Sequence, residues 1–306
     1  MPDQPTQMIV TAQPEASEAG ARILMRGGNA VDAAMAAALV QGVVDPQMCG
    51  IAGFGNCQIY DPKCGVHTCI DFHGKTPMAA TPDMWLDRLE GETRDGFGFV
   101  MKDNVNDIGY QSVTTPGSLK AYFEASTEFG TMDWSDIVAP AVAQAEAGFI
   151  IRPHVNFWWT FGADLGRVSN VDRCAFSKTG RSAFLNPDGS AKGIGAHVAN
   201  PDMARTLALI AKEGADAFYT GEIAQRIDED FRANGGLLSA KDLASYRTTR
   251  TDPLRGSYRD NDIATNRPPG GGVMLVEMLN ILENFDLSAM GGLATKTPVL
   301  AAFFVA

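Results

Sequence analysis

Basic residues and long apolar runs are both scarce in this sequence. Its 306 residues include 25 Lys and Arg against 36 Asp and Glu, which gives a formal net charge of −11. Nucleic acids and anionic membranes are bound through basic surfaces, so this balance argues against both as partners. No apolar run reaches the roughly 18 residues that a transmembrane helix needs, so we expect no membrane span.

Histidine is also scarce, and the motifs of metal and nucleotide sites are missing. The four histidines fit neither H-E-x-x-H nor a paired-Cys zinc pattern, and the chain has no G-x-S-x-G. Glycines 270–272 before a helix could hold an anion on backbone amides, but they lack the dinucleotide and P-loop spacing. Close approach of two backbone segments is the favoured interpretation there. We expect no metal and no other cofactor.

The first residues, MPDQPTQMIVTAQP, have neither a basic region nor an apolar core of the kind found in signal peptides. The sequence therefore predicts a cytoplasmic protein with reduced thiols. Four of the five cysteines fall between positions 49 and 69. A hairpin turning at 61–65 would bring Cys57 and Cys69 roughly opposite each other. A disulfide between them is geometrically conceivable, but buried free thiols are favoured.

Residues 29–77 are the stretch around which the chain is organised. An almost wholly apolar helix, 33–44, follows a shorter helix that begins at Pro14, and Asn29 and Asp32 are suited to its N-terminal cap. A glycine-rich corner and a hairpin with strands near 55–60 and 66–72 come next. Neither face of the hairpin is cleanly polar, with Tyr60 assigned to one apolar face. This pattern indicates a sheet between two layers.

The remaining segments read as alternating helices and short strands, with a polar surface excursion at 78–107. We expect helices at 117–129, from 133 with a break at Pro140, from 200 to 214, at 221–233, after Ser239 and at 273–283, and strands at 8–12, 108–113 and within 254–264. Residues 151–200 should be loops with short helices. Without a repeat or a long linker, the sequence predicts one α/β domain over 1–306, with an atypical apolar tail at 294–306.

His73 is the strongest candidate site residue, because it lies where the second hairpin strand runs into a loop. Asp71, His73 and Lys75 alternate, so an extended chain would present all three on one face. Such a group could hold an anion or orient a substrate. The alternative is a polar strand end near water. Composition and spacing thus indicate an α/β scaffold without a complete catalytic set.

Several strings in the chain resemble gamma-glutamyltranspeptidases over residues 8–293. They are ASEAG at 16–20, GGNAVDAA at 27–34, GIAGFG at 50–55, TPGS at 115–118, PLRGSY at 253–258 and PPGGG at 268–272. The resemblance implies an N-terminal-nucleophile hydrolase, an αββα sandwich made as a precursor that cuts itself into a large and a small subunit. The N-terminal Thr of the small subunit is then the nucleophile, and it cleaves small gamma-glutamyl amides through an acyl-enzyme.

This chain departs from the family pattern in two ways. It corresponds to most of a large subunit, truncated before the nucleophilic Thr, so we expect it to be inactive alone and to need a small-subunit partner. The resemblance also places the family's substrate-carboxylate arginine at His73, and a neutral imidazole cannot grip a carboxylate with two donors. A related acylase or amidohydrolase is therefore an alternative to a gamma-glutamyltransferase. A non-catalytic, partner-binding subunit is another.

Overall fold

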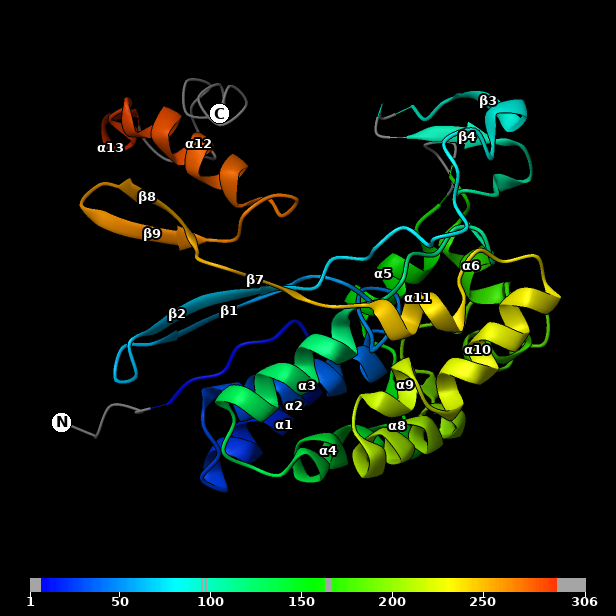
Figure 1. The fold of residues 1–306 in the computed structure, drawn as a ribbon, viewed down its shortest axis with the longest axis horizontal. Helices are drawn as coiled ribbons and strands as arrows, with labels where there is room; N and C mark the ends of the chain where they lie inside the picture. Colours follow the sequence, from blue (N-terminus) through cyan, green and yellow to red (C-terminus); the bar gives the residue numbers. More distant parts are fainter. Residues whose placement is uncertain (1–6, 95, 97, 163–166, 291–306) are drawn as a thin grey trace. The chain divides into compact units, whose positions relative to one another are not determined.

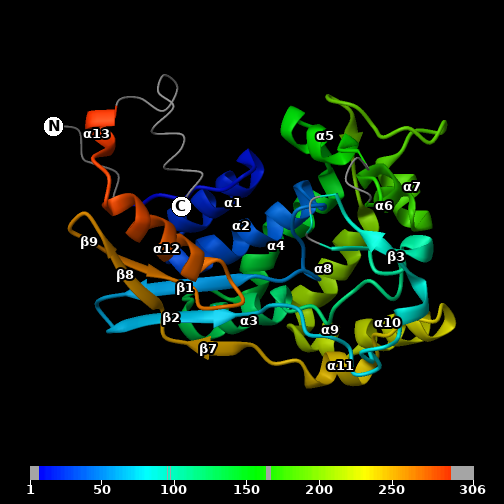
Figure 2. The same cartoon turned by 90° about the horizontal axis from the view of Figure 1, so that it is seen from above.

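The structure is a computed structural model that describes residues 7–94, 96, 98–162 and 167–290. Internal contacts divide the chain into two compact units. Unit 1 comprises Met1–Phe54 and Gly74–Arg247, and unit 2 comprises Gly55–His73 and Thr248–Ala306. The mixture of helices and strands confirms the predicted α/β class (Figures 1 and 2). The apolar tail expected at 294–306 lies outside the described residues.

Unit 1 is mainly helical. Its helices are α1 (Pro14–Met25), α2 (Ala30–Val44), α3 (Ser118–Phe129), α4 (Trp134–Ala147), α5 (Pro153–Thr160), α6 (Asn170–Ala175), α7 (Lys178–Phe184), α8 (Pro201–Glu213), α9 (Asp216–Tyr219), α10 (Glu222–Ala233) and α11 (Ala240–Ser245). Unit 1 also has two short 3-10 turns, η1 (Leu86–Arg88) and η2 (Lys102–Asn104). Two small antiparallel sheets complete it, a hairpin of β3 (Leu89–Glu92) with β4 (Phe99–Met101), and the pair of β5 (Phe149–Ile150) with the distant β6 (His197–Val198).

The cap of α2 forms as the sequence predicts, and its Asp32 side chain makes further hydrogen bonds that the sequence does not predict. The Asn29 side chain accepts from the backbone of Asp32, and the Asp32 carboxylate accepts in return from the Asn29 N–H at 2.8 Å. Asp32 is fully buried. Its carboxylate also accepts from the N–H and the hydroxyl of Thr131, after α3, at 3.0 and 2.7 Å. One buried carboxylate therefore joins the start of α2 to the loop before α4.

Helix α4 is continuous, and the predicted break at Pro140 is wrong. Proline removes one helical hydrogen bond and crowds the preceding turn, at a cost of about 3 kcal/mol. Three fully buried residues on the same helix, Ile137, Val138 and Ala141, anchor it in the core, and α4 packs against α2 and α8. This packing outweighs the local penalty.

Two predicted strands of unit 1 are absent. Residues 8–12 form no strand, and Met8 and Val10 are both about four-fifths exposed, at 81% and 82%. Residues 108–113 form turns. Short apolar runs do not specify a strand without a partner strand beside them. The polar excursion at 78–107 instead contains the β3–β4 hairpin.

Unit 2 contains a three-stranded antiparallel sheet of order β1 (Asn56–Asp61), β2 (Val66–Asp71) and β7 (Thr249–Thr251). It also contains the hairpin of β8 (Leu254–Tyr258) and β9 (Asn261–Thr265), helix α12 (Gly272–Glu283), which packs on both strands of that hairpin, and α13 (Leu287–Met290). The β1–β2 hairpin, the β8–β9 hairpin and α12 lie where the sequence places them.

The register of β1 with β2 corrects the expectation that Cys57 and Cys69 lie roughly opposite each other. Cys57 lies opposite Ile70, and Cys69 lies opposite Gln58, so the two thiols point to opposite faces. All five cysteines are free. The loop between the strands is one residue shorter than expected, and a one-residue shift moves every side chain of a strand to the other face. The same shift leaves Tyr60 67% exposed, whereas the sequence predicts it on an apolar face.

Candidate active site

Asp71 and His73 form a side-chain pair at the end of β2. One oxygen of Asp71, Oδ1, accepts from the backbone N–H of His73 at 2.9 Å and from its Nδ1 at 2.8 Å. A carboxylate only accepts, so Nδ1 carries the proton and Nε2 is the acceptor when the ring is neutral. Each side chain is about one quarter exposed, at 25% for His73 and 22% for Asp71. The pair thus fixes the orientation of a partly accessible imidazole.

Cys69 lies on the same face of β2 as Asp71, and the charge of Arg267 acts on its buried thiol. The Cys69 thiol donates to Gln58 Oε1 at 3.6 Å. Burial raises the pKa of Cys69, the Arg267 guanidinium lowers it in part, and the negative charge of Asp71 raises it. Arg267 donates from Nε to the carbonyl of Asp252 at 2.8 Å. Sequence reasoning did not single out Arg267; its place directly before the PPGGG string was the available signal.

Lys75, the third member of the predicted polar set, has contacts within unit 1. Its ammonium donates to the carbonyl of Arg247 at 2.8 Å and lies 5.1 Å from the centre of the Tyr246 ring. Its backbone pairs with Thr115 in an isolated antiparallel bridge. The structure therefore brings Asp71 and His73 together, whereas the Lys75 side chain contacts Arg247 and Tyr246 instead.

The glycine corner is bound to the start of α3. The carbonyl of Gly53 accepts from the N–H groups of Gly117 and Ser118 at 2.9 and 3.1 Å, and Ile51 accepts from Leu119 at 3.2 Å. A Cβ on Gly53 would lie 3.1 Å from the Ser118 hydroxyl, so glycine permits this close approach. Two strings that are distant in the sequence therefore meet in one place.

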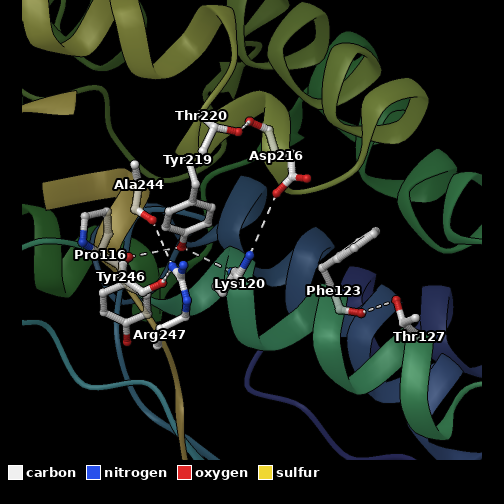
Figure 3. Close-up of polar contacts among 10 residues, drawn as sticks. All are labelled: Pro116, Lys120, Phe123, Thr127, Asp216, Tyr219, Thr220, Ala244, Tyr246 and Arg247. Carbon is white, nitrogen blue, oxygen red and sulfur yellow. Dashed lines mark hydrogen bonds and ion pairs between the residues drawn. The ribbon is translucent and has the colours of Figure 1, made fainter. Parts of the chain in front are cut away.

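A buried phenol also contacts the segment at the start of α3 (Figure 3). Tyr219 is 2% exposed; its hydroxyl donates to the carbonyl of Pro116 at 3.0 Å and accepts from the N–H of Lys120 at 3.2 Å. Burial raises the pKa of Tyr219, so the phenol stays protonated at neutral pH. Its ring stacks on Tyr246, with centroids 6.0 Å apart. These contacts make Tyr219 a positioning residue for the loop before α3.

The glycines before α12 support the close-approach interpretation. A Cβ on Gly270 would lie 1.4 Å from Nδ2 of Asn266, and one on Gly272 would lie 2.0 Å from the Asn266 carbonyl oxygen. The Gly270 N–H already donates to the carbonyl of Arg267 at 3.0 Å. The backbone of Asn266 thus accounts for glycine at position 272, whereas the atom nearest to Gly270 is the end of the Asn266 side chain, which can turn away.

The described part of the chain has neither a metal site nor a membrane span. No cluster of three or more His, Cys, Asp or Glu side chains with the geometry of a metal site occurs among those residues. Within the same residues, every helix is too short or too polar to span a bilayer.

Known proteins resemble this chain along most of its length. Residues 16–299 match the family described as gamma-glutamyltranspeptidase. The chain is 38% identical over 288 residues to the acylase ACY 1 proenzyme of Pseudomonas sp. (strain SE83), covering 93% of this chain and 49% of that protein. It is 35% identical over 282 residues to the glutathione hydrolase proenzyme of Bacillus subtilis (strain 168), covering 92% of this chain and 45% of that protein. The chain thus spans about half the length of these curated relatives.

Solved structures show the same fold. The gamma-glutamyltranspeptidase of Helicobacter pylori matches with a TM-score of 0.83 and 30% identity, over 99% of this chain and 82% of that one. The cephalosporin acylase of Bacillus halodurans matches with a TM-score of 0.76 and 26% identity, over 98% and 54%. These likenesses confirm the predicted α/β fold of the N-terminal-nucleophile hydrolase type. The chain belongs to the gamma-glutamyltranspeptidase family.

Proposed function

We propose that this chain is the large-subunit part of an amide hydrolase or acyltransferase whose nucleophilic Thr is carried by a partner small subunit. The observation that carries the proposal is the family match over residues 16–299, together with the Asp71–His73 pair at the end of β2. The substrate is a small amide, either gamma-glutamyl or a related acyl amide.

The proposed chemistry is acyl transfer in two steps. The partner's Thr hydroxyl attacks the amide carbonyl while its own N-terminal amine takes the proton, and the leaving amine departs with a proton as the acyl ester forms. Water or an acceptor amine then displaces the ester and regenerates the hydroxyl. Within this scheme His73 orients the acyl group, and Asp71 holds its imidazole at 2.8 Å.

His73 favours acyl groups that do not depend on a bidentate carboxylate clamp. An arginine presents a planar fork of donors to a carboxylate, whereas one imidazole edge presents a single atom. The somewhat higher identity to an acylase than to a glutathione hydrolase, 38% against 35%, points the same way. We therefore rank a related acylase substrate alongside gamma-glutamyl amides.

Exposed features of unit 2 suit a docking partner. In the described residues the outer edge of β1 has no neighbouring strand, and such an edge can pair with another chain. Helix α12 exposes Val273, Met274 and Leu275, which are 47%, 61% and 43% exposed. A small subunit that covered both would bury apolar surface and complete the sheet.

We place the protein in the cytoplasm, where its free thiols would stay reduced.

The test compares two anilides, gamma-glutamyl and butyryl, which share the scissile amide and differ in the amino and carboxylate groups. The chain alone should turn over neither, and turnover by it would contradict a nucleophile on the partner. The chain is then coexpressed with the part of the Pseudomonas acylase proenzyme that it does not match. Hydrolysis should appear, with less than about a tenfold preference for gamma-glutamyl. A complex that forms but stays inactive would indicate a non-catalytic, partner-binding subunit.

His73→Arg tests the specificity argument in the same complex. Two charge-assisted hydrogen bonds to the substrate carboxylate should raise the preference for gamma-glutamyl by about tenfold or more. Lys75→Arg is the matched control, because that side chain contacts Tyr246 and Arg247, and it should leave the ratio unchanged. An unchanged ratio in His73→Arg would remove His73 from the substrate site.

A further inference from the structure

Strand β2 lies between β1 and β7, and its last residue forms a row of three polar side chains with them (Figure 2). Asp71 lies directly opposite Asn56 on β1 and Thr249 on β7. Opposed residues of antiparallel strands project to the same face, with Cβ atoms about 4.5–5.5 Å apart. Asn56 and Thr249 are exposed, and the Asp71 side chain is 22% exposed. All three side chains of this set, the Asp71 row, are therefore within reach of a small molecule.

The Asp71 carboxylate has one oxygen that is engaged and one that is accessible. Oδ1 accepts from both the backbone N–H and the Nδ1–H of His73, at 2.9 and 2.8 Å. Oδ2 accepts no hydrogen bond from the described residues, and it is not among the unpaired polar atoms that are shielded from solvent. Oδ2 is therefore an open acceptor, next to an imidazole that Oδ1 holds in place.

This end of β2 carries a negative charge. Because Nδ1 bears the proton, the neutral His73 ring adds no positive charge and presents an acceptor at Nε2. In the described part of the chain no lysine or arginine forms an ion pair with Asp71. Arg267, whose charge reaches this face of β2, donates to the carbonyl of Asp252 at 2.8 Å instead. A ligand carboxylate would face a like charge here, whereas a ligand ammonium would face an opposite one.

We propose that the Asp71 row binds an ammonium group on the acyl part of the substrate and disfavours a carboxylate at the same position. An ammonium has three N–H donors: one would donate to Asp71 Oδ2, and the other two would face the side-chain oxygens of Asn56 and Thr249. This inference rests on the proposed acyl transfer and names its substrate class, the amides of amino-substituted acyl groups. A gamma-glutamyl group carries both an ammonium and a carboxylate, so attraction and repulsion offset each other, which agrees with the small preference expected for it above.

Three anilides that differ only in the group on the fourth carbon of the acyl chain test the proposal in the coexpressed complex. They are the 4-aminobutyryl, butyryl and glutaryl anilides, which carry an ammonium, no charge and a carboxylate at that carbon. The values of kcat/KM should fall in that order, with at least about a tenfold difference between the first and the last, since a charge-assisted hydrogen bond is gained in one and a repulsion in the other. Equal values, or a preference for glutaryl, would overturn the inference and leave the acyl transfer intact.

A binding measurement separates this inference from the proposed function. If the complex hydrolyses none of the three anilides, the acyl transfer fails, and recognition is then measured without turnover. Isothermal titration calorimetry of the full chain compares 4-aminobutyramide with glutaramate, which mimic the first and the third substrate. The amine should bind at least about tenfold more tightly. Equal affinities, tighter binding of glutaramate or no saturable binding of the amine would overturn the inference.

Two variants locate the ammonium site. Asp71→Asn keeps the size of the side chain and an oxygen for His73, but it replaces the open acceptor with an amide donor, so the preference for 4-aminobutyryl over glutaryl should disappear. Asp61→Asn is the matched control, because it removes the same charge and keeps the acceptor for the Lys63 N–H. Its partner Val66 lies five residues before Asp71, about 16 Å along β2, so the ratio should stay at the wild-type value. A wild-type ratio in Asp71→Asn would overturn the inference, and because both substrates are measured on one preparation, partial loss of folded protein does not change the ratio.

Discussion

Asp32 and Thr131, which are 99 positions apart, are joined by hydrogen bonds from both the N–H and the hydroxyl of Thr131 to one buried carboxylate. The same carboxylate completes the cap of α2. Removing it would leave several buried donors without an acceptor, which costs more than the loss of a single exposed contact.

Asp32→Ala should therefore lower the free energy of unfolding by about 3 kcal/mol, measured by urea denaturation followed by circular dichroism. Asp136→Ala removes a partly exposed ion pair with Arg26 and should cost about 1 kcal/mol or less. Similar losses in the two variants would show that the link to Thr131 adds nothing to stability.

Neighbouring glycines at the start of α12 should respond differently to the same substitution. Gly272→Ala places a Cβ 2.0 Å from the backbone carbonyl oxygen of Asn266, whereas a Cβ on Gly271 would meet no atom within 4 Å. We expect Gly272→Ala to destabilise the protein by about 2 kcal/mol and Gly271→Ala to be nearly neutral in thermal melting. Phosphate should stabilise neither variant nor the wild type; selective protection of the wild type by phosphate would restore the anion-cradle interpretation.

The stability of the protein should fall in alkali partly because of Cys49. Burial, with the negative charge of Asp45 adding to it, raises the pKa of this thiol from 9.0 to about 12. The unfolded chain loses the thiol proton at the lower pKa, so the contribution of the neutral thiol is complete below about pH 9 and is lost as the pH rises towards 12.

Cys49→Ala should accordingly show a shallower loss of stability between about pH 8 and about pH 11 than the wild type, measured from urea midpoints. The same change at Cys64, which is exposed, should alter the slope less. Parallel slopes in wild type and Cys49→Ala would contradict the burial argument.

The sequence predicted the features that depend on interactions between residues close together in the chain. The cap of α2 by Asn29 and Asp32, the β8–β9 hairpin and the start of α12 all depend on residues within a few positions of each other. The family strings added the fold and the position of His73, and the pairing of His73 with Asp71 follows from their alternation. Arg267 escaped notice, because its influence on Cys69 exists only after β2 and the segment following β9 come together.

Non-local packing decided the features that the sequence did not predict. A cap motif does not predict that Thr131 donates to Asp32. The continuity of α4 through Pro140 depends on its packing against α2 and α8. The faces of Cys57 and Cys69 depended on one residue in the loop between their strands.

Strand β2 pairs on one side with β1, which is its neighbour in the chain, and on the other with β7 at Thr249–Thr251. During synthesis the β1–β2 hairpin leaves the ribosome long before β7 exists, so one edge of β2 waits unpaired while most of unit 1 is made. A strand edge in that state can pair with the wrong chain. The rate of translation between the two segments, and the chaperones present during that interval, should therefore govern the yield of correctly folded protein.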